Sequence, residues 1–304
     1  MTSPVLRRVA VAAAALSLAT VAGCGSDSSS SSGAAARPSA TAVPTATRDA
    51  SITLPPELAN KSEIVVAADA SYAPNEFYAD DNKTIIGLDI DLANALGQAL
   101  GKPVRVENAP FDAILPGLQA GKYDIGMSSF TDTKEREQTF DFVTYFTAGT
   151  SLMVKKGNPG GLNPDALCGK KVAVQKGTTQ ADEDLPERSK TCTDGGQPAI
   201  ESLIFPDQGA ANLALQSGRA EAVLADSPVI AYQIKQTNGQ FEQAGATYAT
   251  APYGIAVVKG NGYAQPLLAA LESVQSQGVY TRILEAWGAQ GGALNEPVIN
   301  GAVE

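Results

Sequence analysis

From Glu63 onward, short apolar runs alternate with segments in which apolar residues recur at helical spacing. The run 64–68 is typical of a buried strand, and the segment 88–100 has helical spacing with Gly101 as a stop signal. We expect strands at 64–68, 103–106, 124–127, 171–174, 202–205, 222–225 and 255–258. We expect helices at 88–100, 111–120, 208–217, 228–237, 263–277 and 280–288, with others beginning at Thr133 and at 177–180. This alternation predicts an α/β fold with mainly parallel sheets.

The N-terminal segment has the pattern of an export signal. Arg7 and Arg8 precede an apolar stretch, 9–21, that is too short to span a bilayer core about 30 Å thick. The stretch ends in Val-Ala-Gly-Cys, which resembles the bacterial lipobox, so we expect removal of 1–23 and lipidation of Cys24. A plain secretory signal is the alternative. Residues 24–60 are rich in Ser, Ala, Pro and Thr, and we expect them to form a disordered tether.

The composition narrows the chemistry that the folded body can perform. The chain has 304 residues, 44% of them hydrophobic, which suits two ordinary lobes. It contains no histidine, which excludes histidine-based zinc sites, Ser-His-Asp and Cys-His nucleophile systems and a histidine general base. The net charge of -10 argues against binding of nucleic-acid phosphates, and the Asp-rich segments do not form a calcium loop. We expect no metal, no cofactor and no nucleic-acid partner.

Polar residues that follow the expected strands are candidates for a ligand site, because open α/β sheets bind ligands at the carboxyl ends of strands. Tyr72 offers an aromatic wall, and the guanidinium of Arg136 suits a carboxylate. Residues 177–180 lie where a strand meets a helix N-terminus, which favours an anion, and Asp226 offers a carboxylate to an ammonium group. Together these groups supply what a free α-amino acid requires.

Each of these candidates also has a purely structural explanation. Tyr72 fits a packed loop, and Arg136 fits a solvated charge run, 134–137. Residues 177–179 fit ordinary helix capping, and Asp226 fits a cap at the start of the next helix. Taken singly, none of the candidates identifies a site.

One longer stretch resembles a family signature. Gly87-Leu88-Asp89-Ile90-Asp91-Leu92, continuing to Leu100, is similar to the signature of polar amino-acid-binding proteins, the extracytoplasmic solute-binding components (family 3) of ABC importers. Supporting stretches follow in the expected order at 69–74, 107–124, 127–136, 172–180 and 220–226. The resemblance extends from about residue 63 to residue 288.

The resemblance implies a two-lobed periplasmic-binding-protein fold, or venus-flytrap, with two crossover hinge strands and the ligand between the lobes. The crossovers fall near 148–150 and 248–252. Lobe one then comprises 61–147 plus 253–297, lobe two comprises 148–252, and 298–304 form a C-terminal tail.

The resemblance also implies the role of each site residue. Tyr72 and Phe111 match the aromatic pair that encloses the ligand's side chain. Arg136 and the backbone of Thr179 match contacts to the ligand's carboxylate, and Asp226 matches the acceptor of its ammonium group.

Four further residues complete the implied site. Ser129 and Thr131 match lobe-one contacts to the amino and carboxylate groups, while Asp69 and Ser128 match positions that touch the ligand's side chain. Asn75 departs from the aromatic or apolar residue that is usual in the family at that position.

These implications describe a monomeric amino-acid-binding protein, not an enzyme, anchored to the cell membrane by Cys24 and delivering its ligand to an ABC permease. Asp69 favours a basic or amide amino acid, since a carboxylate accepts hydrogen bonds from such side chains. Two alternatives stay open: a periplasmic cyclohexadienyl dehydratase on the same scaffold, and a sensor that reports occupancy to a membrane receptor.

Two cysteines lie in the expected lobe two. Outside the cytosol, Cys168 and Cys192 are expected to form a disulfide, with two free buried thiols as the alternative. In the chain-entropy description, a disulfide that closes a loop of about 25 residues stabilises the fold by on the order of 3 kcal/mol.

Overall fold

The computed structural model describes residues 43–303. All of them belong to one compact unit. The predictions of a signal peptide at 1–23, a lipidated Cys24 and a tether up to residue 42 lie outside the described residues and stay predictions.

The described chain is built on an eight-stranded sheet with the order β5-β1-β6-β11-β7-β10-β8-β9. The strands are β1 Ile64–Ala68, β5 Val104–Asn108, β6 Ile125–Gly126, β7 Phe140–Lys155, β8 Lys171–Gln175, β9 Glu201–Phe205, β10 Ala222–Asp226 and β11 Phe241–Val258. β1 pairs in parallel with β5 and β6, and β8 pairs in parallel with β9 and β10. Within this sheet the antiparallel pairings all involve β7 or β11: β7 with β10, β11 with β6, and β7 with β11. The predicted α/β class is therefore confirmed, with one parallel group of strands on each side of an antiparallel pair.

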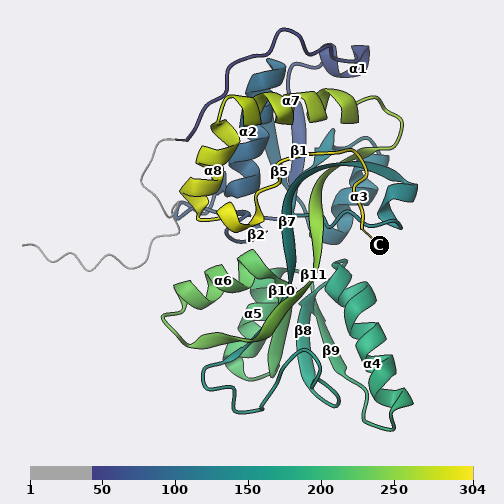
Figure 1. Ribbon diagram of the computed structural model, residues 1–304, viewed down its shortest axis with the longest axis vertical. Coiled ribbons are helices and arrows are strands. Elements are labelled where there is room, and N and C mark those ends of the chain that lie inside the picture. Colours follow the sequence, from purple (N-terminus) through teal and green to yellow (C-terminus); the bar gives the residue numbers. More distant parts are fainter. Residues whose placement is uncertain (1–42, 304) are drawn as a thin grey trace, which may run out of the picture. The chain divides into compact units, whose positions relative to one another are not determined.

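The antiparallel pair joins the two parallel groups. β7 and β11 stay paired from Phe140 and Val258 at one end to Lys155 and Phe241 at the other, and both strands pass through both groups (Figure 1). Their register shifts between Ala244 and Tyr248 and again between Tyr248 and Ala251. These shifts lie where the crossovers are expected, and the two-lobed fold is confirmed. The residue limits of the lobes, 61–147 with 253–297 and 148–252, stay a prediction.

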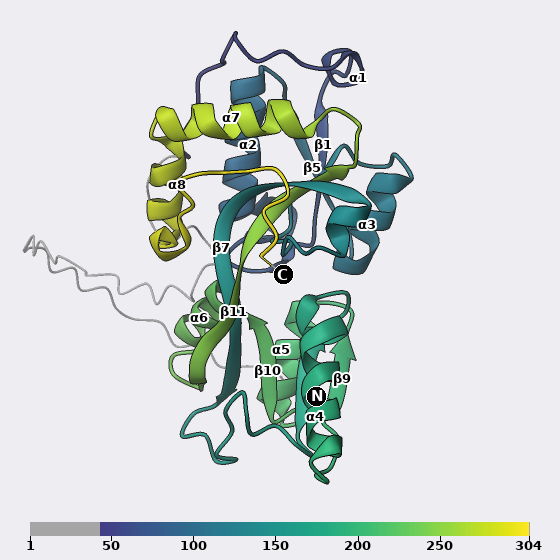
Figure 2. The same cartoon turned by 45° about the vertical axis from the view of Figure 1, so that its right-hand side comes forward.

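Helices cover both faces of each parallel group (Figure 2). In lobe one they are α2 Leu88–Leu100, α3 Phe111–Gln119, α7 Ala264–Ser276 and α8 Val279–Trp287, and in lobe two α4 Leu185–Asp194, α5 Gln208–Ser217 and α6 Ser227–Gln236. Alternate residues of β1 show the two layers: Val66 packs in the cluster with α2, α7 and α8, whereas Ala67 packs with α3. Residues 64–68 are apolar throughout because both faces of the strand are buried.

The segment 43–60 corrects the predicted extent of the disordered tether. The Ala46 N–H donates to Gln98 Oε1 at 2.7 Å, and the Asp49 N–H donates to the Ala99 carbonyl at 2.9 Å, so the segment lies against α2. A short helix, α1 Pro56–Ala59, buries Leu58 in the lobe-one core. The tether prediction is wrong for these residues, because a few apolar side chains in a polar segment are enough to dock it.

Several elements differ from the sequence expectations. The helix expected from Thr133 is only the 3-10 turn η1 Arg136–Gln138, since its charge run offers no apolar face. After Gly177 the chain forms a π-helical turn, η2 Gln180–Asp184, that continues into α4. The sequence did not predict a small sheet of β2 Ser71–Tyr72, β3 Glu76–Tyr78 and β4 Ile85–Ile86. The C-terminal segment includes the turn η3 Gln290–Gly292 and then pairs with β7 through Val298 and Thr144.

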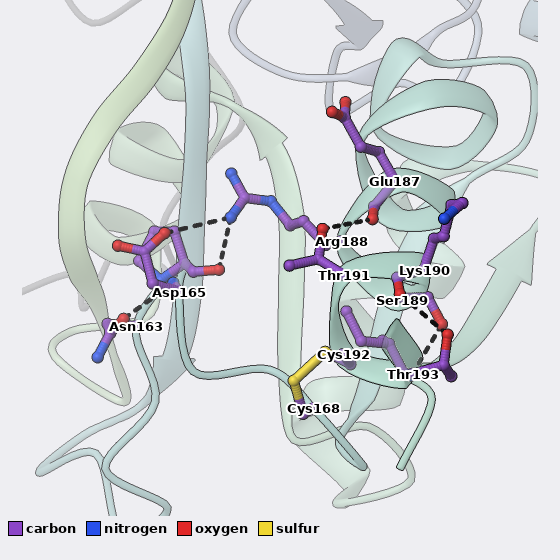
Figure 3. Close-up of a disulfide and its surroundings, with 12 residues drawn as sticks. Asn163, Asp165, Cys168, Glu187, Arg188, Ser189, Lys190, Thr191, Cys192 and Thr193 are labelled. Carbon is purple, nitrogen blue, oxygen red and sulfur yellow. Dashed lines mark hydrogen bonds and ion pairs between the residues drawn. A yellow bond between two sulfur atoms is a disulfide. The ribbon is translucent and has the colours of Figure 1, made fainter. Parts of the chain in front are cut away.

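The predicted disulfide is present in lobe two. Cys168 and Cys192 are bonded, with their Cα atoms 5.5 Å apart, and the bond joins the loop before β8 to α4 (Figure 3). Arg188 of the same helix donates to the Pro164 carbonyl at 2.7 Å and lies 3.5 Å from the carboxylate of Asp165. α4 is thus fastened to this loop at two points. Among residues 43–303, no helix is long and apolar enough to cross a membrane.

Candidate functional site

A small cavity lies where strand ends and loops of the two lobes meet. Its lining comes from the ends of β8 and β10 and from the segments that follow β1, β5, β6 and β8. The lining residues are Asp69, Tyr72, Phe111, Ser129, Thr131, Arg136, Gln175, Thr178, Thr179, Gln180 and Asp226. Eight of the nine residues expected to bind a ligand are in this set.

Arg136 supplies the positive group of the cavity. Its guanidinium donates to the Thr131 carbonyl at 2.8 Å and to the Gly177 carbonyl at 3.1 Å, and so joins lobe one to lobe two. The group lies 5.6 Å from the ring centre of Phe130 and 6.0 Å from that of Phe111. Burial lowers the pKa of Arg136, but a guanidinium stays protonated at neutral pH. Because two of its five donors are engaged by carbonyls, the others are available to an anion.

Asp226 supplies a carboxylate from the opposite lobe. It ends β10 and occupies the N-cap position of α6, but its side chain makes no capping hydrogen bond, which rules out the capping explanation. Its oxygens accept hydrogen bonds from Gln180 Nε2 at 2.8 Å and from the Tyr253 hydroxyl at 2.7 Å. Burial raises the pKa of Asp226, and no described lysine or arginine forms an ion pair with it.

Asp69 supplies a second carboxylate, at the end of β1. One oxygen accepts hydrogen bonds from the Phe111 N–H at 3.0 Å and from Gln175 Nε2 at 2.8 Å, and the other accepts from the Ser71 N–H. The contact with Gln175 crosses from lobe one to lobe two, and it is neutral. Burial raises the pKa of Asp69, and the negative charge of its ionised form has no cationic partner among residues 43–303.

The remaining walls come from aromatic and hydroxyl side chains. Tyr72 lines the cavity, and its hydroxyl accepts a hydrogen bond from the Asp226 N–H at 3.2 Å. The ring of Phe111 stacks on that of Phe130, with the ring centres 4.5 Å apart. Thr178 and Thr179 lie at the start of the helical segment 180–194, where backbone N–H groups lack helical partners. The cavity therefore has a cationic end, two carboxylates and apolar walls.

Ser128 is the predicted residue that does not line the cavity. Its hydroxyl donates to Glu76 Oε1 at 2.8 Å and accepts from the Asp69 N–H at 3.0 Å. It therefore lies behind Asp69, as part of the support of the site. Asn75, which departs from the family pattern, donates from Nδ2 to Ser129 Oγ at 2.8 Å and so also lies beneath the cavity.

The sequence did not single out Gln175 and Tyr253, which hold the two carboxylates. Gln175 ends an apolar strand, and a polar residue at that position was the available signal. Tyr253 lies within β11, far from Asp226 in sequence, and nothing local indicates their contact. Across the described chain, no group of three or more Cys, Asp and Glu side chains is arranged to hold a metal ion.

Comparison with known proteins identifies relatives of this chain. Residues 64–290 match the family described as bacterial extracellular solute-binding proteins, family 3. The chain is 34% identical over 258 residues to the arginine-binding protein ArgT of Corynebacterium glutamicum, covering 85% of this chain and 84% of the relative. A solved ancestral arginine-binding protein bound to arginine superposes with a TM-score of 0.68 at 36% identity, covering 75% of this chain and 98% of that structure. An ancestral amino-acid-binding protein, described as a precursor of cyclohexadienyl dehydratase, superposes with a TM-score of 0.65 at 34% identity, covering 76% and 97%.

Proposed function

The chain belongs to family 3 of the bacterial extracellular solute-binding proteins, and on that basis we propose that it captures a free amino acid in the cavity between its lobes and delivers it to an ABC transporter permease. One observation carries this proposal. Arg136 and Asp226 face one cavity from opposite lobes, and neither forms an ion pair with another described residue. A zwitterion placed between them pairs both charges.

The two ends of an α-amino acid match these two groups. The α-carboxylate binds the free donors of Arg136 and the backbone N–H groups at Thr179, and the α-ammonium group binds Asp226. An isolated charge is costly to bury, so a ligand that lacks either group loses a large part of its binding energy. Because the partners lie on different lobes, the ligand stabilises the closed arrangement, as in hinge closure around a substrate.

We assign the ligand as a basic amino acid, and arginine is the first candidate. Asp69 lies in the same cavity, and its cross-lobe partner, Gln175, leaves the charge of the ionised carboxylate without a counter-charge. A guanidinium or ammonium group on the ligand neutralises that carboxylate, whereas an amide only hydrogen-bonds to it. The names of the relatives agree: one is an arginine-binding protein, and one solved structure holds arginine.

The dehydratase alternative is not favoured by the geometry. A dehydratase needs a positioned general acid or base, and without histidine that role falls to Asp69 or Asp226. Both carboxylates already accept two or more hydrogen bonds from the protein, and Asp226 retains the position of an ammonium acceptor. We therefore assign a binding role, not an enzymatic one. The sensor alternative uses the same closure and differs only in the membrane partner.

Membership of an extracellular family places the protein outside the cytoplasm. That a lipid anchors it to the membrane is part of our proposal. Lipidation of Cys24, with the segment up to residue 42 as a tether, holds the monomeric binding protein close to its permease. Mass spectrometry of the membrane-associated protein tests this directly, because acylation adds a defined mass to the peptide that begins at Cys24.

The site assignment is tested by Asp226→Asn, which keeps the size of the side chain and removes its charge. We expect arginine to bind at least about 100-fold more weakly, since breaking one partner of a buried charge pair costs about 3–5 kcal/mol. Isothermal titration calorimetry measures the affinity, and thermal unfolding checks the fold. Asp165→Asn is the control, because that carboxylate is 95% exposed, and it should leave the affinity unchanged. An Asp226→Asn protein that binds arginine like the wild type contradicts the assignment.

A further inference from the structure

Two acidic side chains are fully buried beneath the cavity. Glu76 on β3 and Asp89 in the first turn of α2 both have an exposed fraction of 0%. Their carboxyl groups both lie beside Ser129 Oγ, at 3.5 Å and 3.3 Å, and no described lysine or arginine forms an ion pair with either. The ligand contacts described above do not use these groups, so their burial needs another explanation.

The hydrogen bonds around the pair are incomplete when both groups are ionised. Asp89 Oδ2 accepts from the Tyr145 hydroxyl at 2.7 Å and from the Ser129 N–H at 2.9 Å. Asp89 Oδ1 is buried and has no donor among residues 43–303. Burial and the charge of Asp89 raise the pKa of Glu76 well above its usual range. Two carboxyl groups this close share one proton rather than ionise together, and a proton on Glu76 gives the pair a hydrogen-bond donor that two carboxylates lack.

Ser129 connects this pair to the cavity. It lines the cavity and has a φ of +54°, a left-handed conformation that is uncommon for residues other than glycine, asparagine and aspartate. Its Oγ accepts from Asn75 Nδ2 at 2.8 Å, and it lies 3.3 Å from Asp89 Oδ2 and 3.5 Å from Glu76 Oε2. The Ser129 hydroxyl therefore donates its proton to the buried pair, away from the cavity. A lone pair remains to accept a hydrogen bond from a ligand.

We propose that Glu76 and Asp89 are a proton-sharing pair that positions Ser129, so that the cavity floor offers a hydrogen-bond acceptor and one negative charge to N–H groups of the ligand. This inference rests on the proposed function, because it takes the ligand to be an amino acid with N–H donors. Glu76 and Asp89 are positioning residues that act through Ser129. The other titratable groups that face the pair are Asp69, Tyr72 and Tyr145.

A double-mutant cycle tests whether Glu76 acts through Ser129. Glu76→Met removes the shared proton and the carboxyl group, and we expect arginine to bind about tenfold more weakly by calorimetry. In a Ser129→Ala background the same change should weaken binding by no more than about threefold, because the hydroxyl that the pair orients is gone. Equal losses in both backgrounds would mean that Glu76 has only a structural role and would overturn the inference.

Glu76→Gln tests the shared proton and covers the case in which Glu76→Met does not fold. Glutamine keeps the shape of a neutral Glu76, donates to Asp89 and accepts from Ser128, so arginine affinity should stay within about threefold of the wild type. The infrared difference spectrum at neutral pH, wild type minus Glu76→Gln, should show the carbonyl stretch of a protonated carboxylic acid; the difference cancels the contribution of Asp132, whose pKa burial raises to about 7. A loss above tenfold, or identical spectra, would show that Glu76 is ionised and would overturn the inference.

The wild-type titration separates this inference from the proposed function. If the wild-type protein binds no amino acid, the proposed function fails and so does everything built on it. If it binds arginine but the cycle is additive or the infrared band is absent, only the proton-sharing pair fails.

Discussion

At the scale of single residues, the site is defined by buried carboxyl groups that have no cationic partner within the described part of the chain. Burial raises the pKa values of Asp69, Asp226 and the Glu76–Asp89 pair. The carboxyl groups of Asp69 and Asp226 accept hydrogen bonds from the neutral donors Gln175 and Tyr253. Burying such groups lowers the stability of the folded protein, and a cationic ligand that pairs with them offsets this loss.

The residue scale also shows what the sequence can predict of the site. Asp69, Arg136 and Asp226 follow strand ends or sit within a recognisable motif, so the sequence by itself indicates a role for their chemistry. Gln175 and Glu76 gain their roles from neighbours that are distant in sequence, 106 and 52 residues away. No local pattern indicates those contacts, and this is why the support of the cavity could not be predicted.

Asp69→Asn tests the preference for a basic side chain. The change removes the charge but keeps an oxygen that accepts hydrogen bonds, so arginine should bind at least tenfold more weakly, whereas glutamine should change by no more than about threefold. Calorimetric titrations of both ligands into the wild type and the variant measure how much each affinity falls. Equal losses for arginine and glutamine would show that Asp69 serves the fold or the ligand backbone, not the ligand side chain.

At the scale of elements, the lobes meet where the turn after β8 approaches the N-terminus of α3. Lys176 forms an ion pair with Asp112 at 2.7 Å, and a Cβ added to Gly177 would lie 2.9 Å from the Asp112 Cβ. The sequence predicted both β8 and α3, because buried strands and amphipathic helices have clear hydrophobic periods. The sequence did not predict most of β7, since that segment has neither a uniform apolar run nor a turn signal to mark its ends.

Gly177→Ala tests whether this approach is needed for ligand capture. Alanine at the φ of +78° costs about 1 kcal/mol, and its methyl group also keeps the turn away from α3, so arginine should bind about tenfold more weakly. Gly157→Ala is the matched control, with a φ of +79° and no atom within 4 Å of the added Cβ. It should lower the thermal midpoint similarly and leave the affinity unchanged. If both variants bind arginine equally well, close contact at Gly177 is not part of capture.

At the scale of the whole molecule, two lobes are joined by β7 and β11 and by contacts across the cavity. These contacts include Gln175 with Asp69, the Asp226 N–H with the Tyr72 hydroxyl, and Arg136 with the Gly177 carbonyl. The alternation of strands and helices predicted the α/β class, but the division into two lobes came from the family resemblance. Periodicity alone does not show that two strands continue through both lobes.

One calorimetric experiment tests the central claim, that the cavity recognises both ends of a basic amino acid. The purified chain is titrated with L-arginine, with agmatine, which lacks the α-carboxylate, and with 5-guanidinopentanoate, which lacks the α-ammonium group. We predict that arginine binds with one site per chain and that each analogue binds at least about 100-fold more weakly, because each leaves one buried charge unpaired. Agmatine or 5-guanidinopentanoate binding as tightly as arginine, or no binding of any amino acid, would contradict the account.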